Sequence, residues 1–392
     1  MVGPERRCEV RGRFRRSMGT VALLGAAAVA LPAAPGYAAA RPAAPPDIPV
    51  SELLTRLQKL YQQTEAATEA YNATEEDLKA QAKLSKKLDG RLKAARANLA
   101  EGRADAGRLA REQYTGSGPG GLSPYVQFLL SKDPEQALDR GHLLKEAAGH
   151  QADTVTRLAG SAKKADKLAT EAKRALDKKK SLADKRKKQK AKVESRLREV
   201  EAMLSSLSAD QLAELSRLEQ AGMKDAQKAL LGSGKLGGPH APSEEGQRAM
   251  AYALTQVGKP YVWGAEGPDS FDCSGLTSQA WAHAGKPIPR TSQEQWKQLP
   301  HVSLRELRPG DLVIYFPGAT HVALYLGNGM VVQAPRPGAE VKVSPIAANP
   351  LLGAVRPDEG APGLKDYTPP EIPDGAQDGS DTGYGDPTAP AN

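Results

Sequence analysis

Residues 261–285 read YVWGAEGPDSFDCSGLTSQAWAHAG, and this stretch organises the chain from 243 to 357. The turn-forming run 268–270 interrupts regular structure before Cys273. The residues after Cys273 have the apolar spacing of a short helix that ends at Gly285. Cys273 is therefore predicted to lie at a helix N-terminus. Backbone N–H groups and the helix dipole at that place favour a thiolate and lower the pKa of a cysteine.

A cysteine nucleophile needs a general base, which is usually histidine. Three of the six histidines lie outside 243–357, and two others fall on the predicted cysteine helix and on a loop. His321 instead begins a predicted strand after a tight turn, where a side chain projects from a rigid edge. Asn328-Gly329 then predicts a hairpin turn with a return strand over 330–334. His321 is the preferred candidate for the base.

Several motifs in this region resemble those of the NlpC/p60 family of cell-wall cysteine peptidases. Phe271-Asp-Cys-Ser-Gly275 after Tyr261-Val-Trp-Gly264 is similar to the family signature. The further matches follow in order: Pro289-Arg-Thr-Ser292, Leu307-Arg-Pro-Gly-Asp-Leu-Val313, His321-Val-Ala-Leu-Tyr-Leu-Gly-Asn-Gly329 and Gln333-Ala-Pro-Arg336. The resemblance covers nearly all of 243–357. It implies a papain-like α+β fold and cleavage of an amide bond in peptidoglycan stem peptides, typically beside D-isoglutamate.

The resemblance also assigns catalytic roles by position. It makes Cys273 the nucleophile and His321 the general base. Gln333 falls where the family has a third polar residue that orients the base, most often His, so this sequence departs from the pattern. Glutamine can accept a hydrogen bond from the imidazole, as Asn does in papain-like enzymes, but it cannot compensate the charge of an imidazolium.

Five further residues are expected to meet the substrate. By resemblance Tyr261 lines the oxyanion side, and Asp272 and Ser274 face the amine end of the substrate. An N-cap or first-turn acid is the alternative role for Asp272. Arg290 and Arg336 could bind substrate carboxylates, although structural salt bridges would explain both arginines equally well.

The region before the compact domain predicts a long antiparallel α-helical coiled-coil hairpin over 41–231. Mainly apolar residues at heptad spacing run from Leu53 to Leu109 and again from Leu144 to Leu207. A stretch rich in Gly and Pro at 115–124 separates the two runs. Only 18 residues of the chain are aromatic, and nine of them, including all three Trp, lie in 243–357. The hairpin is therefore predicted to lack a conventional core.

The net charge of +8 is unevenly distributed, because 39–242 carries +10 and 358–392 carries −7. Lys173–Lys192 contains eleven Lys or Arg and two Asp. This run either docks to an anionic wall polymer or lipid head group, or is simply a solvated helix face. A nucleic-acid partner is not expected, since the basic segment has no stacking aromatics.

The ends of the chain have their own expected roles. Residues 1–40 combine a basic cluster, an apolar run and small residues, which predicts a secretory signal peptide. A retained anchor is the alternative, and Arg15-Arg16 is weakly typical of a twin-arginine signal. We expect a flexible linker at 232–242 and a disordered acidic tail at 358–392. After signal cleavage, Cys273 would be the one remaining thiol.

These features predict a secreted, cell-wall-associated enzyme that needs no cofactor and no metal, since the sequence lacks HxH, HExxH and CxxC motifs. Its expected partners are stem peptides and, through the coiled coil, a membrane division complex; a hairpin of this kind could also occlude the active site. Two alternatives stay open. One is a non-catalytic coiled-coil adaptor that binds stem peptides, and the other is amidase or acyl-transfer chemistry on the same fold.

Overall fold

The computed structural model describes residues 48–115, 124–130 and 133–377. All of them belong to one compact unit that begins at Ile48. The predicted signal peptide, the Gly- and Pro-rich stretch at 116–123 and the end of the acidic tail lie outside the described residues. Within the described part of the chain, no helix has the length and apolar character needed to cross a membrane.

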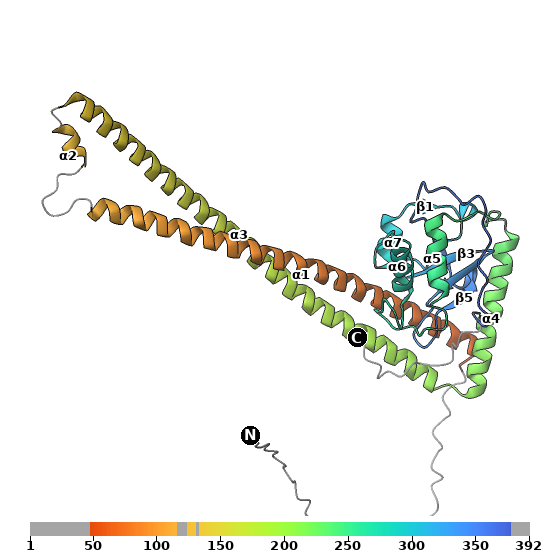
Figure 1. The fold of residues 1–392 in the computed structure, drawn as a ribbon. Coiled ribbons are helices and arrows are strands. Elements are labelled where there is room, and N and C mark those ends of the chain that lie inside the picture. Colours follow the sequence, from red (N-terminus) through yellow and green to blue (C-terminus); the bar gives the residue numbers. More distant parts are fainter. Residues whose placement is uncertain (1–47, 116–123, 131–132, 378–392) are drawn as a thin grey trace, which may run out of the picture. The chain divides into compact units, whose positions relative to one another are not determined.

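Two long helices form the predicted hairpin. The helices of this region are α1 (Val50–Thr115), α2 (Pro124–Leu129) and α3 (Pro134–Ser205). Helices α1 and α3 lie side by side and are antiparallel over much of their length (Figure 1). Their contact is built largely from Leu and Ala, with Leu88, Ala95, Ala165, Leu168, Ala172 and Ala175 buried together. Small alanines let the two backbones approach closely, as the sequence indicated.

The predicted seam is correct for most of α1 but drifts on α3. Ala175 is buried there, whereas Leu176, which the heptad spacing placed in the seam, is 44% exposed. The side-chain amide of Gln81 contacts α3 at this point, and its Nε2 donates to the carbonyl oxygen of Ala175 at 3.0 Å. A strict seven-residue repeat and a helix of 3.6 residues per turn diverge over long distances, which accounts for the shift.

The hairpin ends earlier than predicted, because a separate helix, α4 (Ala209–Gly232), follows a break after Ser205. A capping box between Ser208 and Gln211 starts α4. The helix packs on the compact domain instead of extending the hairpin: Gln227 donates to the carbonyl oxygen of Gly329 at 2.9 Å. The helical region thus ends at Gly232, and its last helix belongs with the compact domain.

The compact domain has the predicted α+β fold. Its helices are α5 (Glu244–Leu254), α6 (Cys273–His283) and α7 (Ser292–Gln298). Its strands are β1 (His301–Val302), β2 (Leu312–Tyr315), β3 (His321–Gly327), β4 (Met330–Gln333), β5 (Lys342–Pro345) and β6 (Leu351–Val355). The short 3-10 turns are η1 (Leu304–Glu306) and η2 (Ile346–Ala348). The strands form one antiparallel sheet in the order β1-β6-β2-β3-β4-β5.

Both faces of the sheet are covered. Leu312 and Ile314 of β2 point into a core that also holds Trp281 of α6, while Val313 and Tyr315 belong to a second cluster on the other face. Leu230 of α4 packs against that second cluster. Alternate residues of a strand face opposite sides, so a strand buried on both faces is apolar throughout. This explains why β2 and β3 read as continuous hydrophobic runs.

The linker and the start of the tail are attached to the domain, contrary to the flexibility predicted for them. In the linker, His240 Nε2 lies 3.0 Å from the carbonyl oxygen of Arg305. In the tail, the buried carboxylate of Asp358 pairs with Arg308 at 2.9 Å. Ala376 is buried, and its carbonyl oxygen accepts from the amide of Val343 at 2.8 Å. Polar composition missed these contacts because a few specific pairs, and not average hydrophobicity, hold the segments.

Candidate active site

Cys273 is the first residue of α6, as predicted, and its position is fixed by Asp272. The carboxylate of Asp272 accepts hydrogen bonds from the amides of Gly275 at 2.7 Å and Gly264 at 2.9 Å. The first bond caps the helix, and the second ties it to the preceding loop. Asp272 therefore caps α6 in this arrangement, and its binding of a substrate amine stays a prediction.

His321 and Gln333 meet on neighbouring strands. His321 begins β3 and Gln333 ends β4, with the Asn328-Gly329 turn between them. The imidazole Nε2 lies 2.7 Å from Oε1 of Gln333, and both side chains are buried. Because this amide oxygen can only accept, Nε2 carries the proton in the neutral ring and Nδ1 is left as the basic nitrogen. The contact places Gln333 where it can orient the imidazole, which is the role that the resemblance implied for it.

Helix α1 lies against both candidate catalytic residues. Oε1 of Glu65 is 3.1 Å from Nδ1 of His321, and the thiol of Cys273 is 3.8 Å from Oε1 of Glu69. Glu65 and Glu69 are one helical turn apart, which separates their Cβ atoms by only about 6 Å. Cys273 and His321 consequently face adjacent turns of one helix. The second oxygen of Glu65 is buried and has no hydrogen-bond partner among the described residues.

Glu69 and Asn72 form hydrogen bonds with the polar groups around the thiol. Glu69 accepts from the Ser274 hydroxyl at 2.7 Å and from the Ser292 amide at 2.8 Å. One turn further on, Nδ2 of Asn72 donates to Asp272 at 2.9 Å. Glu69 and Asn72 are 1% and 3% exposed, so they exclude water from the site. A substrate could not reach Ser274 or Asp272 while α1 is in this place.

The buried carboxylates around Cys273 disfavour its reactive thiolate form. Burial, reinforced by the carboxylates of Glu69, Asp272 and Glu65, raises the pKa of the Cys273 thiol well above its usual value. The sequence predicted a lowered pKa from the helix N-terminus. That expectation is wrong for this arrangement, since loss of solvation and three nearby negative charges outweigh the helix dipole.

The two groups that face the thiol and the imidazole are shifted as well. Burial and the charge of Asp272 raise the pKa of Glu69 from 4.5 to about 7. Burial by itself would lower the pKa of His321, but the carboxylate and hydrogen bond of Glu65 outweigh it, and the net shift is upward. Both groups therefore hold protons more tightly in this arrangement than in water.

Arg290 holds the loop before Cys273 in place. Its guanidinium makes two parallel bonds to Asp272, at 3.0 Å and 2.8 Å, and a third to the Ser274 hydroxyl at 2.8 Å. Its side chain is only 8% exposed. Of the two roles that the sequence allowed, the structure shows the salt bridge. Tyr261, predicted on the oxyanion side, is buried, and its burial raises the pKa of the phenol well above the usual value.

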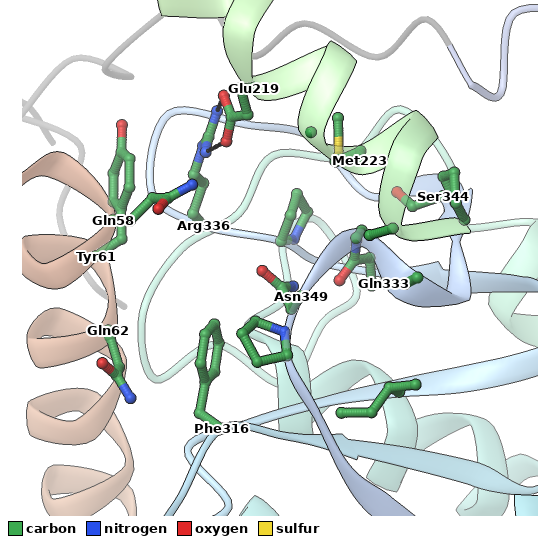
Figure 2. Close-up of a pocket in the computed structure, with 18 of the residues that line it drawn as sticks. Gln58, Tyr61, Gln62, Glu219, Met223, Phe316, Gln333, Arg336, Ser344 and Asn349 are labelled. Atoms are coloured by element: carbon green, nitrogen blue, oxygen red, sulfur yellow. Dashed lines mark hydrogen bonds and ion pairs between the residues drawn. The ribbon is translucent and has the colours of Figure 1, made fainter. Parts of the chain in front are cut away.

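Arg336 lies beside a cavity of about 1080 Å³ that α1, α4 and the sheet enclose together (Figure 2). Its guanidinium pairs with Glu219 of α4 at 2.5 Å and lies 4.7 Å from the centre of the Tyr61 ring of α1. Gln333 lines the same cavity, as Figure 2 shows. Arg336 thus contacts both helices: it forms a salt bridge with α4 and stacks on an aromatic ring of α1.

All eight site residues predicted from the sequence belong to the compact domain. All except Arg336 lie around the place where Glu65, Glu69 and Asn72 of α1 contact this domain. These three α1 residues were missed. Their spacing of four and three residues marks one helix face, but α1 has five other glutamates, and nothing local separates a buried glutamate from a solvated one. Within the part of the chain that the structure describes, no group of three or more His, Cys, Asp and Glu is arranged to hold a metal ion.

Comparisons with known proteins place this site in context. Residues 258–352 match the family model described as NlpC/P60 family. A probable endopeptidase of Corynebacterium glutamicum is 45% identical over 111 residues, which is 28% of this chain and 53% of that protein. The chain therefore spans about half the length of this relative. A probable endopeptidase of Mycobacterium tuberculosis is 29% identical over 353 residues, covering 79% of this chain and 90% of that protein.

Two solved structures are similar to part of this chain. The NlpC/p60 domain of the peptidoglycan hydrolase SagA is 33% identical and covers 28% of this chain and 97% of its own, with a TM-score of 0.27. RipD of Mycobacterium tuberculosis, described as a non-catalytic NlpC/p60 protein adapted to peptidoglycan binding, is also 33% identical. It covers 29% of this chain and 98% of its own, with a TM-score of 0.27.

Proposed function

The chain carries an NlpC/P60 family domain at residues 258–352, and on this basis we propose that it is a cysteine-type peptidoglycan endopeptidase. The observation that carries the proposal is the hydrogen bond of 2.7 Å between His321 and Gln333, which leaves Nδ1 as the basic nitrogen of the imidazole. The probable endopeptidases among its relatives support the hydrolase assignment.

The proposed reaction begins when Nδ1 of His321 takes the proton of the Cys273 thiol. The thiolate attacks the carbonyl carbon of the bond between D-isoglutamate and the diamino acid of a stem peptide. Backbone N–H groups at the start of α6 would stabilise the oxyanion. The imidazolium then returns its proton to the departing amine, leaving a thioester on Cys273. Water, deprotonated by His321, hydrolyses the thioester and restores the thiol.

The proposed location follows from the substrate, because peptidoglycan lies outside the cytoplasmic membrane. Export through the predicted signal at 1–40 would deliver the enzyme to the cell wall. A membrane division complex that engages the hairpin stays a prediction. So does binding of substrate groups by Tyr261, Asp272 and Ser274.

We also propose that α1 keeps the enzyme inactive. Glu65 lies against the basic nitrogen of His321, and Glu69 lies against the thiol and binds Ser274. The raised pKa of Cys273 disfavours the thiolate in this state. Catalysis would require α1 to move away, which would expose the two catalytic groups to solvent and substrate together.

Mass spectrometry of purified muropeptides tests both proposals. The samples are the full chain, its Glu65→Ala/Glu69→Ala double variant and the same double variant that also carries Cys273→Ala. We expect product from the double variant, little from the unmodified chain and none when Cys273→Ala is added. Fragment masses identify the bond and separate endopeptidase from amidase or acyl-transfer chemistry. Equal rates for the chain and the double variant would contradict autoinhibition while leaving the peptidase intact.

A non-catalytic adaptor is the second candidate, and the departure at Gln333 is the observation that favours it. Absence of product from the double variant, with several stem peptides tried and helix content retained, would support the adaptor. The Gln333→His variant then separates the cases. Recovered cleavage would show that only the orienting residue was missing, whereas binding without cleavage would establish the adaptor.

A further inference from the structure

The hairpin carries a dense basic surface that the active site does not use. It consists of residues 79–96 of α1 and 163–192 of α3, called here the basic band. These two segments hold 21 Lys or Arg and five Asp or Glu, a net charge of +16 in a chain whose total is +8. All 21 basic side chains are exposed.

The tertiary structure creates the band by joining two segments that are far apart in the sequence. The bond between Gln81 and the carbonyl oxygen of Ala175 lies within it. So does the shared apolar cluster around Leu88 and Leu168. The basic run of α3 was visible in the sequence, but the sequence did not show that basic residues of α1 lie beside it. The seven Lys and Arg of 79–96 extend the positive surface across both helices.

The charges of the band oppose the stability of the hairpin. Lys83 and Lys87 are one turn apart on α1, and Arg174 and Lys178 are one turn apart on α3. Like charges at this spacing destabilise a helix. Among the described residues, only Lys79, Arg186 and Lys190 of the band form ion pairs. An arrangement that costs stability and leaves most charges unneutralised points to an anionic ligand.

The distribution of these charges indicates the kind of ligand. Basic side chains occupy every side of α3 except the buried seam, as the consecutive residues Lys178–Lys180 and Lys185–Lys188 show. A flat bilayer could meet only one side. Helices that lie on a bilayer also need an apolar face, and Leu84 and Leu176 are the only large apolar residues of the band that are exposed. A flexible linear polyanion can follow both helices.

We propose that the basic band binds a linear phosphodiester polymer of the cell wall and so holds the enzyme beside its substrate. This rests on the proposed wall function, but the binding does not depend on catalysis. The interaction would be electrostatic, with an affinity that falls as the salt concentration rises, because each neutralised phosphate releases counterions.

Binding is tested with fluorescently labelled poly(glycerol phosphate) and the full chain carrying Cys273→Ala. The band variant is Lys83→Gln/Lys87→Gln/Lys178→Gln/Lys187→Gln, whose residues are exposed and form no ion pair with any residue that the structure describes. Glutamine has nearly the helix propensity of lysine. The matched control is Arg103→Gln/Lys145→Gln/Lys224→Gln/Lys228→Gln, which removes the same charge from exposed positions of α1, α3 and α4 outside the band.

We expect the band variant to lose affinity by roughly tenfold or more, the control to lose less than about twofold, and the salt slope to decrease only in the band variant. Circular dichroism checks that helix content is retained. Equal losses in the two variants, or no loss in the band variant, would overturn the proposal. So would tighter binding to duplex DNA or to phosphatidylglycerol vesicles than to the polymer. Failure of the muropeptide assay would leave the binding result standing.

Discussion

Oε1 of Glu65 lies 3.1 Å from Nδ1 of His321, on the side of the imidazole that Gln333 does not occupy. In the proposed mechanism this nitrogen takes the proton of Cys273. A residue of α1, more than 250 positions away in the sequence, therefore occupies the place where the base must act. The predictions that follow depend on this contact and on the residues that support it.

Removing the two α1 carboxylates should make Cys273 reactive. In Glu65→Ala/Glu69→Ala, solvent reaches the thiol and two negative charges that raise its pKa are gone. We expect alkylation of Cys273 by iodoacetamide to become at least about tenfold faster at neutral pH, because the thiolate is the reactive form. Peptide mass spectrometry measures the rate at this residue. Glu101→Ala, an exposed position on the same helix, is the control, and an equal rate in all three proteins would contradict the covered site.

The attachment of α1 should weaken as the pH rises. Glu69 has a pKa of about 7 when buried here and an ordinary value of 4.5, so between these values the attached state binds more protons than the released state. His321, whose pKa is also raised, acts in the same direction. The stabilisation from both groups is complete at low pH and is lost as the pH rises through the raised values.

Alkylation of Cys273 measures this pH dependence. At pH values below its pKa, a simple thiol reacts about tenfold faster for each unit by which the pH rises. In the unmodified chain we expect a steeper dependence near pH 7, because deprotonation of Glu69 also releases α1. Glu69→Gln has no such proton to lose, so the slope of log rate against pH should fall by up to about one. Identical slopes in the two proteins would show that Glu69 does not control the attachment.

Gln333 should affect turnover more than binding. Its amide oxygen holds the imidazole with Nδ1 free, so Gln333→Ala should lower kcat roughly 10- to 100-fold with little change in KM, a part of what a general base contributes. Gln333→His should retain most of the activity. The kinetics are measured with a muropeptide in the Glu65→Ala/Glu69→Ala background, and Gln298→Ala, an exposed position, is the control. An unchanged kcat in Gln333→Ala would show that Gln333 does not orient the imidazole.

Arg290 should be needed for the stability of the compact domain. Arg290→Ala leaves the fully buried carboxylate of Asp272 without its partner, which typically costs about 3 kcal/mol. Arg290→Lys should recover only part of this, because lysine cannot make the two parallel bonds. Urea unfolding measures the loss, with Arg305→Ala as an exposed control. Equal stability of the two alanine variants would show that other groups can replace Arg290 as partners of the Asp272 carboxylate.

The motifs of 243–357 were sufficient to predict the α+β fold, which is confirmed, and the similarity to the NlpC/P60 family, whose model matches residues 258–352. They also placed Cys273 at the start of a helix and His321 beside Gln333. These placements are local: a cap fixes the helix start, and the Asn328-Gly329 turn fixes the register of the two strands. The catalytic roles of these residues stay predictions until the variants are measured.

The sequence by itself determined the helices of the hairpin and the chemistry of the compact domain, because apolar spacing, turn residues and caps act over a few neighbouring positions. Only the tertiary structure decided that α4 folds back onto the sheet, that Glu65 and Glu69 cover the site, and that two basic segments form one band. The physical reason is that a charged helix face carries no local mark of its partner. Whether a glutamate is solvated or buried depends on the hydrogen-bond donors and positive charges of a surface hundreds of residues away.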